Sequence, residues 1–268
     1  MTADIDTISC GEHAELDAWK GIWAAVPAHV RDRFQLSLDV HGSAVVCRAL
    51  GVPTWFFNRV MGVGLDGPAD LGWIESQVRR FRETDTPHGV SICRDGQAPQ
   101  LGTWLERQGL RHTTTLAKMM RTTDDPPTPS PDVAIELAAR ADGDRFGAAA
   151  ARGFGMPTPM ADWFARLPGR DGLHVYLALD GDDVVGTGVL SVQGEVGWLG
   201  FGATLPEHRG KGVHRALMAR RVRDAVELGC RWLVTETNQA QSDEPTPSLD
   251  NMKRNGFELA YERLNYVS

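Results

Sequence analysis

Residues 197–218 read GWLGFGATLPEHRGKGVHRALM. Their order predicts a strand, a short loop and a long amphipathic helix that runs from about residue 210 to 228. Gly210 and Gly212 remove side chains where the backbone must come close to a ligand, and the helix start offers free amides and a partial positive charge. Full positive charges come from Arg209, Lys211 and Arg215. The segment is suited to hold a pyrophosphate, although an ordinary glycine-rich turn between strand and helix has the same outline.

Two familiar nucleotide-binding motifs do not explain this segment. A Walker loop needs Ser or Thr after Lys211 and a glycine at position 205, where the chain has Gly212 and Leu205. A literal G-x-G-x-x-G occurs at 62–67, but Pro68 follows the third glycine, which should lie inside a helix. Neither a Walker-type nor a dinucleotide-binding protein is therefore indicated.

The segment resembles the central motif of the GNAT superfamily of N-acetyltransferases, which bind acetyl-coenzyme A (acetyl-CoA). That motif, Gln/Arg-x-x-Gly-x-Gly/Ala, falls on residues 207–212, where Glu207 misses the first position. The broader form, Pro-Glu-x-Arg-Gly-x-Gly after a strand, is intact at 206–212. Residues 251–257 resemble the family's later motif, a short helix that ends in Gly-Phe and leads into the final strand. The resemblance covers about residues 132–268.

The chain repeats parts of this pattern in its first half. Residues 105–110 align with 252–257, and Gly62-x-Gly64 aligns with Gly200-x-Gly202. We interpret this as a tandem duplication with a degenerate N-terminal copy, because residues 64–70 lack a basic, glycine-rich loop. Chance similarity between two common α/β pieces is the alternative. The fold class expected for each copy is α/β (α+β), with a mixed, mostly antiparallel sheet flanked by helices.

A proline-rich segment separates the two copies. Residues 124–131 contain four prolines, which cannot continue a helix or a central strand. We therefore predict a degenerate domain at 1–123, a linker at 124–131 and the acetyltransferase domain at 132–268. The predicted strands 58–63 and 257–267 are too apolar for free edges, so we expect the halves to form a continuous or closely abutting sheet.

The family resemblance implies where acetyl-CoA would bind. The end of the strand would pair with the pantetheine arm, and the amides of the loop and helix start would hold the pyrophosphate. These positions are Phe201, Gly202, Ala203, Thr204, Arg209, Gly210, Lys211, Gly212, Val213, His214 and Arg215. Ser248 and Asn251 either contact the cofactor arm or cap the last helix. Gly200 and Gly202 leave room for the arm or mark a bulge without function.

Acetyl transfer to an amine requires removal of a proton from the ammonium, and Glu236 is the first candidate base. It ends an otherwise apolar strand beside the place where the two central strands should separate. A structural carboxylate or a clamp for the substrate is an equally good interpretation of this residue. Many family members have a Tyr as general acid where this chain has Met252, so a proton donor must be sought elsewhere, and Tyr261 is one candidate.

The acceptor is the least defined part of the prediction. Phe154 and Trp163 fall where the family builds its acceptor wall, although aromatic residues more often pack helices together. The loop before residue 248 carries Asp243 and Glu244, which suggest a cationic acceptor. The predicted function is acetyl-CoA-dependent transfer to a primary amine of a small molecule or peptide. The alternative is a non-catalytic acyl-CoA-binding regulatory or scaffold protein.

The composition limits the other classes. The 268 residues carry a net charge of −7, which argues against a nucleic-acid-binding protein, and no apolar run is long enough to suggest a membrane span. The acidic N-terminus does not resemble a secretory signal. Four dispersed cysteines and the absence of metal-binding spacings favour a cytoplasmic protein without a metal site. The oligomeric state stays open, with a pseudo-dimeric monomer as one possibility.

Overall fold

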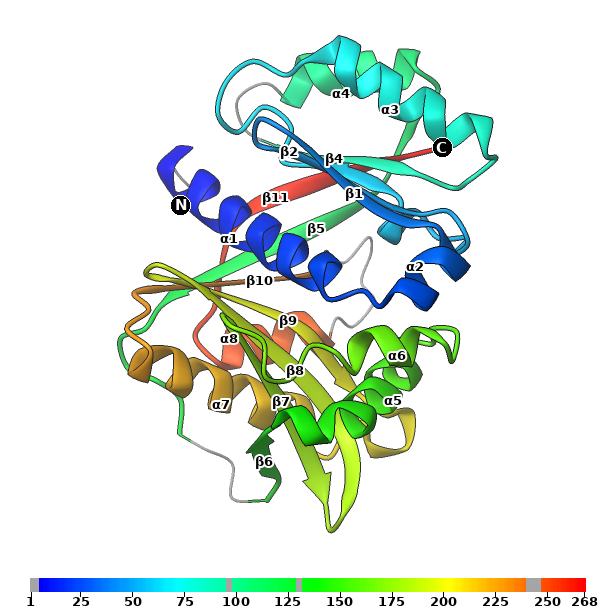
Figure 1. Cartoon of the computed structure of the whole chain (residues 1–268). Helices are drawn as coiled ribbons and strands as arrows, with labels where there is room; N and C mark the ends of the chain where they lie inside the picture. The colour runs from blue at the N-terminus through cyan, green and yellow to red at the C-terminus, as the bar shows by residue number, and fades with distance from the viewer. Residues whose placement is uncertain (1–4, 95–97, 129–131, 240–246) are drawn as a thin grey trace.

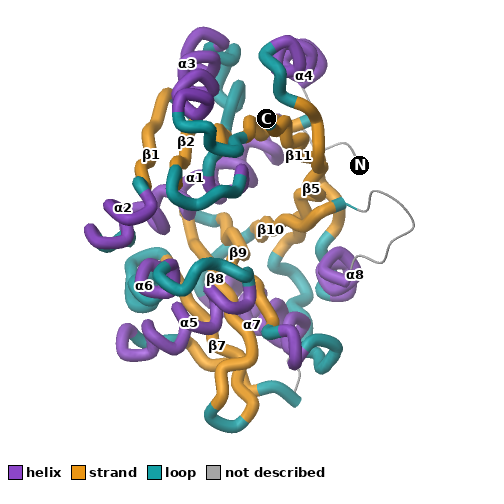
Figure 2. Tube along the Cα trace, turned by 90° about the vertical axis from the view of Figure 1, so that its right-hand side faces the viewer, coloured by secondary structure: helices purple, strands orange, loops and turns teal. Residues whose placement is uncertain are grey.

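The computed structural model describes residues 5–94, 98–128, 132–239 and 247–268 (Figure 1). Within these residues the chain forms one sheet of 11 strands. Figure 2 shows helices on both sides of the strands, with α2, α5 and α6 on one side and α4 and α8 on the other. The expected class, a mixed and mostly antiparallel α/β sheet flanked by helices, is confirmed. No helix among the described residues is long and apolar enough to cross a membrane.

The first half of the chain, up to residue 128, contains more structure than the sequence predicts. Its elements are α1 (Ile5–Ala24), α2 (Ala28–Phe34), β1 (Leu36–His41), β2 (Ala44–Ala49), the 3-10 helix η1 (Trp55–Phe57), β3 (Arg59–Met61), α3 (Leu71–Glu83), β4 (Gly89–Cys93), α4 (Ala98–Arg107) and β5 (Arg111–Thr122). The hydrophobic pattern predicts strands at 58–63, 89–93 and 111–121 and helices at 70–83 and 100–108, which correspond to the elements from β3 to β5. The two N-terminal helices and the β1–β2 hairpin were not predicted.

The second half, from residue 132, follows the predicted order closely. It contains β6 (Ala134–Leu137), η2 (Arg140–Asp142), α5 (Gly143–Gly153), α6 (Met160–Phe164), β7 (Leu173–Asp180), β8 (Asp183–Gln193), β9 (Val196–Thr204), η3 (Pro206–His208), α7 (Val213–Glu227), β10 (Trp232–Asn238), α8 (Pro247–Arg254) and β11 (Glu258–Val267). The sequence predicts helices at 142–151, 159–167, 210–228 and 248–255 and strands at 173–179, 184–192, 196–204, 231–237 and 257–267, so only β6 and the short 3-10 helices lack a prediction.

The two halves exchange their final strands. The strand order is β1-β2-β3-β4-β11-β5-β10-β9-β8-β7-β6. Strand β11 of the second half therefore lies between β4 and β5 of the first, and β5 lies between β11 and β10. Each half contains one parallel pair, β3–β4 or β9–β10. In the sheet, the last strand of the other half lies next to this pair. This arrangement gives the chain an internal pseudo-symmetry.

The continuous sheet expected from the sequence is confirmed, and it covers both apolar strands. β3 pairs with β2 and β4, and β11 is paired along both edges. The domain boundary at 124–131 stays a prediction. In the sheet, the last strand of each half lies among the strands of the other half.

Helix α1 lies across the middle of the molecule (Figure 1) and contacts strands of both halves, including β1, β8, β9 and β11. Its residues share one hydrophobic core with the second half. Trp23 packs edge-on against Trp163 with ring centroids 4.8 Å apart, and Trp163 Nε1 donates a hydrogen bond to the carbonyl of Ile22 at 2.8 Å. The first half is therefore joined to the second by side-chain packing as well as by exchanged strands.

Candidate functional site

The start of α7 has the geometry that anion binding requires. Gly210 and Gly212 adopt φ values of 77° and 81°, a left-handed region that other residues enter at a cost. Gly212 is the N-cap and makes no side-chain capping bond, so the first amides of the helix are left for a ligand. The side chains predicted to add charge, Arg209, Lys211 and Arg215, are exposed around this turn. The loop can therefore present amides, a helix dipole and cations to one anion.

Strands β9 and β10 separate beside this loop. They are paired in parallel from Val196 and Trp232 to Trp198 and Val234, after which each continues without the other. The separation expected from the sequence is present.

A bulge in β9 lies just beyond the point where the strands separate. Its register against β8 shifts between the pairs Val189–Gly200 and Thr187–Ala203. Phe201 lies in the bulge with φ of 51°, and Thr187 Oγ1 donates to its carbonyl at 3.1 Å. Buried Arg221 of α7 donates from Nη1 to the carbonyl of Gly200 at 3.1 Å. Left-handed backbone at a non-glycine residue stores strain, so these bonds hold β9 in an unfavourable conformation.

The opening between β9 and β10 leads into a cavity of about 430 Å³. Both halves of the chain line it, through α1, η1 and β5 from the first and α7, α8, β9 and β10 from the second. Its apolar wall contains seven aromatic side chains, namely Trp19, Phe56, Phe57, Phe154, Phe164, Trp198 and Phe201. Its polar wall contains Thr54, His214, Arg221, Thr235, Glu236, Thr237, Asn238 and Ser248. Its size and composition are those of a small-molecule site.

Glu236 lies at the boundary between this cavity and a buried ionic cluster. Its Oε2 accepts hydrogen bonds from Lys118 Nζ at 3.1 Å and Arg263 Nη1 at 2.9 Å. Lys118 comes from β5 and Arg263 from β11, so the two exchanged strands supply both cations. The side chain of Glu236 is 15% exposed, whereas those of Lys118 and Arg263 are almost fully buried.

Helix α1 supplies the remaining acids of the cluster. Arg263 Nη2 donates to Glu12 Oε1 at 2.7 Å and to Glu15 Oε2 at 2.6 Å, and Lys118 also bonds to Glu15. Burial alone would raise the pKa of Glu12 and Glu15, but Arg263 and Lys118 outweigh it and lower both pKa values. These two carboxylates are therefore charged at neutral pH.

Arg59 is the third cation of this cluster. Its side chain is 1% exposed and its Nη2 lies 3.8 Å from Glu15 Oε1. The guanidinium is stacked over the rings of Phe56 and Trp19, at 4.2 and 5.4 Å from their centroids. Three buried cations thus face three carboxylates, Glu12, Glu15 and Glu236, and the cluster is balanced when Glu236 is ionised.

His214, in the first turn of α7, is a second titratable group of the cavity. Burial and the neighbouring Arg221 lower the pKa of His214 to about 4. Its Nδ1 lies 3.5 Å from Nδ2 of Asn251. The imidazole is therefore neutral at pH 7 and does not repel a cation in the cavity.

Most of the predicted site residues come together around α7 and the cavity. Phe154, Phe201, Gly202, His214, Glu236 and Ser248 line the cavity, and Asn251 approaches it through His214. Ala203 and Thr204 continue β9 toward the phosphate loop, and Val213 is buried at the start of α7. Asp243 and Glu244 lie outside the described residues.

Two predicted site residues are elsewhere, and both assignments are corrected. The hydroxyl of Tyr261 is buried and donates a hydrogen bond to Glu12 Oε1 at 2.8 Å. Burial, and to a lesser extent the negative charge of Glu12, raises the pKa of Tyr261 well above its usual value. It is a buried structural donor and not an acid facing the substrate. Trp163 is fully buried between the halves and does not line the cavity. Its aromatic character serves helix packing.

Two parts of the site were not predicted from the sequence, namely the aromatic rings of the first half and the two cations that hold Glu236. Trp19, Phe56 and Phe57 line the cavity, and Lys118 and Arg263 hold Glu236. A signal was present for Lys118, because it interrupts an otherwise apolar strand pattern, Leu-Ala-Lys-Met-Met, whereas Arg263 lies among polar residues and gave no such signal. Charges at such positions are rarely buried without a partner.

The helix of the first half that corresponds to α7 has a different N-terminus. Asp70 caps α3, and its Oδ1 accepts a hydrogen bond from the amide of Trp73 at 2.9 Å. This bond, together with one from His41, lowers the pKa of Asp70. A carboxylate thus occupies the position where α7 leaves its amides to a ligand, and it would repel a phosphate.

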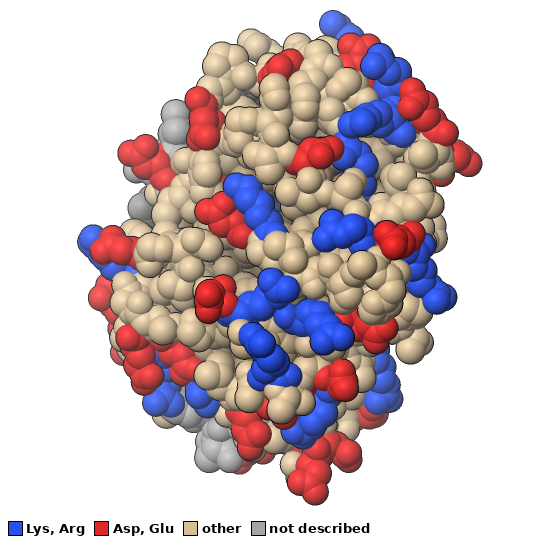
Figure 3. Space-filling model, viewed as in Figure 1, with Lys and Arg blue, Asp and Glu red and all other residues tan. Residues whose placement is uncertain are grey.

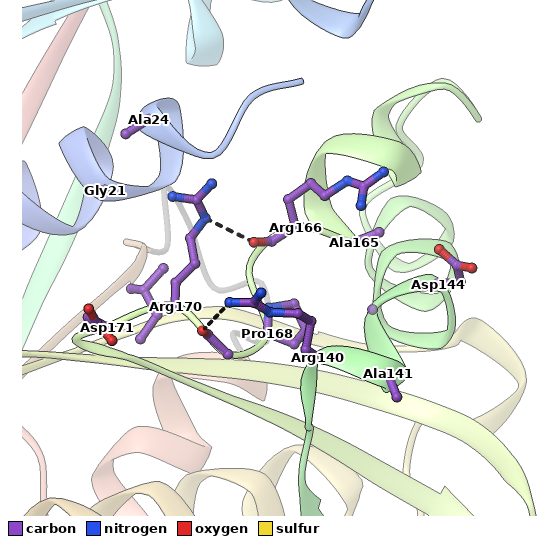
Figure 4. Close-up of a pocket in the computed structure, with 13 residues that line it drawn as sticks. Gly21, Ala24, Arg140, Ala141, Asp144, Ala165, Arg166, Pro168, Arg170 and Asp171 are labelled. Carbon is purple, nitrogen blue, oxygen red and sulfur yellow. Dashed lines mark hydrogen bonds between the residues drawn. The ribbon is translucent and has the colours of Figure 1, made fainter. Parts of the chain in front are cut away.

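A larger hollow of about 710 Å³ lies elsewhere, between the end of α1 and the start of α5 (Figure 4). Its arginines brace a loop, since Arg170 Nε donates to the carbonyl of Arg166 at 3.0 Å and Arg140 Nη2 to that of Gly169 at 3.4 Å. Asp144 and Asp171 also line it. Figure 3 shows Lys and Arg mixed with Asp and Glu over the visible face. This open, polar hollow lacks the apolar enclosure of the β9–β10 cavity, which is the better candidate site.

Comparisons with known proteins bear on the family and the fold. Residues 144–243 match the sequence model of the acetyltransferase (GNAT) family. The second half is thus similar to GNAT-family acetyltransferases over these residues, and the resemblance inferred from the sequence is confirmed. No curated protein matches the chain.

Solved structures share the fold of the whole chain at low sequence identity. A GCN5-related N-acetyltransferase from Kribbella flavida is 16% identical with a TM-score of 0.65, covering 96% of this chain and 95% of its own. One from Sphaerobacter thermophilus is 17% identical with a TM-score of 0.61, covering 87% and 82%. A tandem GNAT protein from the clavulanic acid biosynthesis pathway is 15% identical with a TM-score of 0.59, covering 100% and 96%. The chain therefore shares the fold of these proteins, one of which is a tandem GNAT protein.

Proposed function

We propose that the protein is an acetyl-CoA-dependent N-acetyltransferase that transfers an acetyl group to a primary amine. The observation that carries this proposal is one continuous path through the second half. It begins at the uncapped start of α7, passes the bulge in β9 and ends at the carboxylate of Glu236. The GNAT-family match over 144–243 supports the class of reaction.

The residues of this path fit acetyl-CoA. The amides from Val213 onward, with the exposed Arg209 and Lys211, would hold the pyrophosphate. The end of β9, from Gly202 to Thr204, is unpaired on its β10 side and would hold the pantetheine arm there as a neighbouring strand would. Ser248 and Asn251 would contact the arm from α8. When bound, acetyl-CoA supplies the reactive thioester.

In this proposal Glu236 receives the proton of the ammonium. Lys118 and Arg263 bond to Oε2 and fix the plane of the carboxylate, so Glu236 presents its remaining acceptor positions to the cavity. His214 is neutral and adds no positive charge beside Glu236, so Arg221 is the cation that α7 contributes to the lining. Met252 lines the cavity where other family members carry a Tyr, and Ser248 replaces Tyr261 as the candidate proton donor.

A binding-only function is the second candidate, and Met252 is the observation that favours it. A thioether donates no proton, so a chain that binds acetyl-CoA without transferring the acetyl group would tolerate it. The intact loop at α7 suits both functions.

Measuring thiol release from acetyl-CoA by the full chain distinguishes acetyl transfer from a binding-only function. We expect release that depends on an added primary amine, with a matching N-acetylated product by mass spectrometry, when aryl, aliphatic, amino-sugar and peptide amines are offered. Reactions without an amine give the background. Binding of acetyl-CoA without amine-dependent release across the whole panel would replace this proposal with the second candidate.

Compartment and assembly follow as lesser proposals. The four cysteines are free, which suits the reducing cytoplasm expected from the sequence. Because each half completes the other's sheet, a pseudo-dimeric monomer is the proposed assembly.

A further inference from the structure

We propose that the acceptor is a monoamine carried on a flat apolar group, such as an arylalkylamine, and that the first half of the chain forms much of its pocket. This inference rests on the proposed function, because it names the acceptor of the same site. It also gives the degenerate half a role that its missing phosphate loop leaves open.

The first half supplies an ordered aromatic wall. Trp19 of α1 lies edge-on to Phe56 and Phe57 of η1, with ring centroids 5.8 and 6.3 Å apart. Its indole Nε1 donates to Glu15 Oε1 at 3.1 Å, which ties the wall to the ionic cluster. Arg59 stacks under Phe56 from the side of that cluster. The rings therefore stand beside the carboxylate end of the cavity and not at its mouth.

The second half closes the pocket with two rings that are not fully packed. Phe154 is 42% exposed, and its ring centroid lies 5.9 Å from that of Phe201 in an edge-on contact. Phe201, in the strained bulge, also approaches Trp19 across the boundary between the halves, at 6.4 Å. Phe56 of the first half and Phe154 and Phe201 of the second are thus partly exposed rings in one cavity lining, where a flat apolar group would gain stacking contacts and lose hydrated surface.

The charges of the cavity limit the polar part of the acceptor. Glu236 is the one carboxylate in the lining formed by the described residues, and it already bonds to Lys118 and Arg263. Arg221 adds a buried cation to the same lining. One ammonium can be placed at Glu236, whereas a second one in the same cavity would find no free counter-charge. A polyamine is therefore disfavoured.

Hydroxyl-rich acceptors are disfavoured for a different reason. An amino sugar carries hydroxyl groups all around its ring, so those turned toward the aromatic wall would lose hydrogen bonds to water without replacement, whereas only those facing the polar wall could find partners. An amine with an aryl body has no such groups, and its polar end meets the polar residues of β10. The structure therefore favours an amphipathic acceptor with a single charge.

Steady-state kinetics on Phe56→Ala and Trp55→Ala tests the pocket. Trp55 is the matched control, because it is half-buried on the same 3-10 helix and does not line the cavity. For the unchanged chain we expect kcat/KM to be higher for 2-phenylethylamine than for ethanolamine or spermidine. Phe56→Ala should raise KM for 2-phenylethylamine about tenfold, as loss of part of a buried ring implies, and should leave KM for acetyl-CoA unchanged. Trp55→Ala should change neither value.

Equal effects of the two substitutions, or a preference for spermidine or ethanolamine, would overturn the inference while leaving N-acetylation intact. Calorimetric titration of 2-phenylethylamine, with coenzyme A present, distinguishes failure of this inference from failure of the proposed function. Binding that weakens in Phe56→Ala but not in Trp55→Ala, without turnover, would keep the pocket and remove the acetyl transfer. Should Phe56→Ala fail to fold by circular dichroism, Phe154→Ala, on an exposed loop, takes its place with the same expected results.

Discussion

Glu236 has two roles that a single substitution would mix. It faces the cavity as a candidate base, and it neutralises a buried cluster that also contains Arg59, Lys118 and Arg263. Removing one partner from such a cluster leaves an uncompensated charge in a poorly solvated place. A loss of activity in a Glu236 variant therefore needs a companion measurement of stability.

We expect Glu236→Gln to lower the free energy of unfolding by about 3 kcal/mol, because three cations then face two carboxylates. Lys118→Met alone should also destabilise, since it leaves an unbalanced acid. The double variant restores the balance of charge, so its loss should be smaller than the sum of the single losses by about 1 kcal/mol or more. Urea unfolding of the four proteins measures this coupling. Strict additivity would mean that the charges of Glu236 and Lys118 do not interact as the structure shows.

The neutral His214 predicts a dependence of stability on pH. Its pKa is about 4 in the folded chain and about 6.5 when unfolded, so the unfolded state binds more protons between these values. The native state therefore loses stability as the pH falls from 6.5 toward 4. Between pH 7 and pH 4.5 we expect the unchanged chain to lose about 2 kcal/mol more than His214→Gln, because glutamine takes up no proton. Parallel unfolding curves measured at the two pH values would show instead that His214 titrates normally.

Single residues were predicted best where the backbone demands a particular residue type. The φ values at Gly210 and Gly212 explain why the loop could be recognised from its glycines. Tyr261 and Trp163 were misplaced because a hydroxyl or a ring at a plausible spacing says nothing about which way it faces. Here the first bonds to Glu12 and the second packs against α1.

Among the elements, α7 and α3 show how two copies of one pattern diverge. Both follow a parallel strand and begin after left-handed glycines, but α7 starts at an uncapped Gly212 and α3 at a capping Asp70. The sequence already distinguished the two by the missing basic loop. The structure adds a physical reason, because the Asp70 carboxylate already bonds to an amide of the first turn of α3.

Elements with regular burial patterns were predicted to within a few residues, as for β9 and α5. Helix α1 was missed because Glu12 and Glu15 lie on its buried side, where the helical pattern requires apolar residues. Their partners are Lys118 and Arg263, more than a hundred positions away. The local sequence pattern does not show whether such a charged side chain is buried or exposed to solvent.

At the scale of the whole molecule, the exchange of β5 and β11 brings residues of both halves to the candidate site. A continuous sheet could be expected from the apolar strands, but their order could not. Strand patterns specify which face is buried and not which neighbour lies beside it. The exchanged strands carry the cations that hold Glu236, and α1 and η1 carry the aromatic wall. The degenerate half is therefore part of the site although it lacks a phosphate loop.

The central claim is that acetyl-CoA binds at the start of α7 and nowhere in the first half. Isothermal titration of the full chain, of Gly210→Asp and of Gly64→Asp tests it most directly. Gly64 is the matched control, because it occupies the corresponding strand-to-helix loop of the first half with the same φ of 77° as Gly210. Asp is among the residues that tolerate this conformation best, so the comparison isolates the added charge.

We predict one site per chain, a dissociation constant raised about thirtyfold or more by Gly210→Asp, and an unchanged constant in Gly64→Asp. Two equivalent sites per chain, or equal weakening by the two substitutions, would contradict the account.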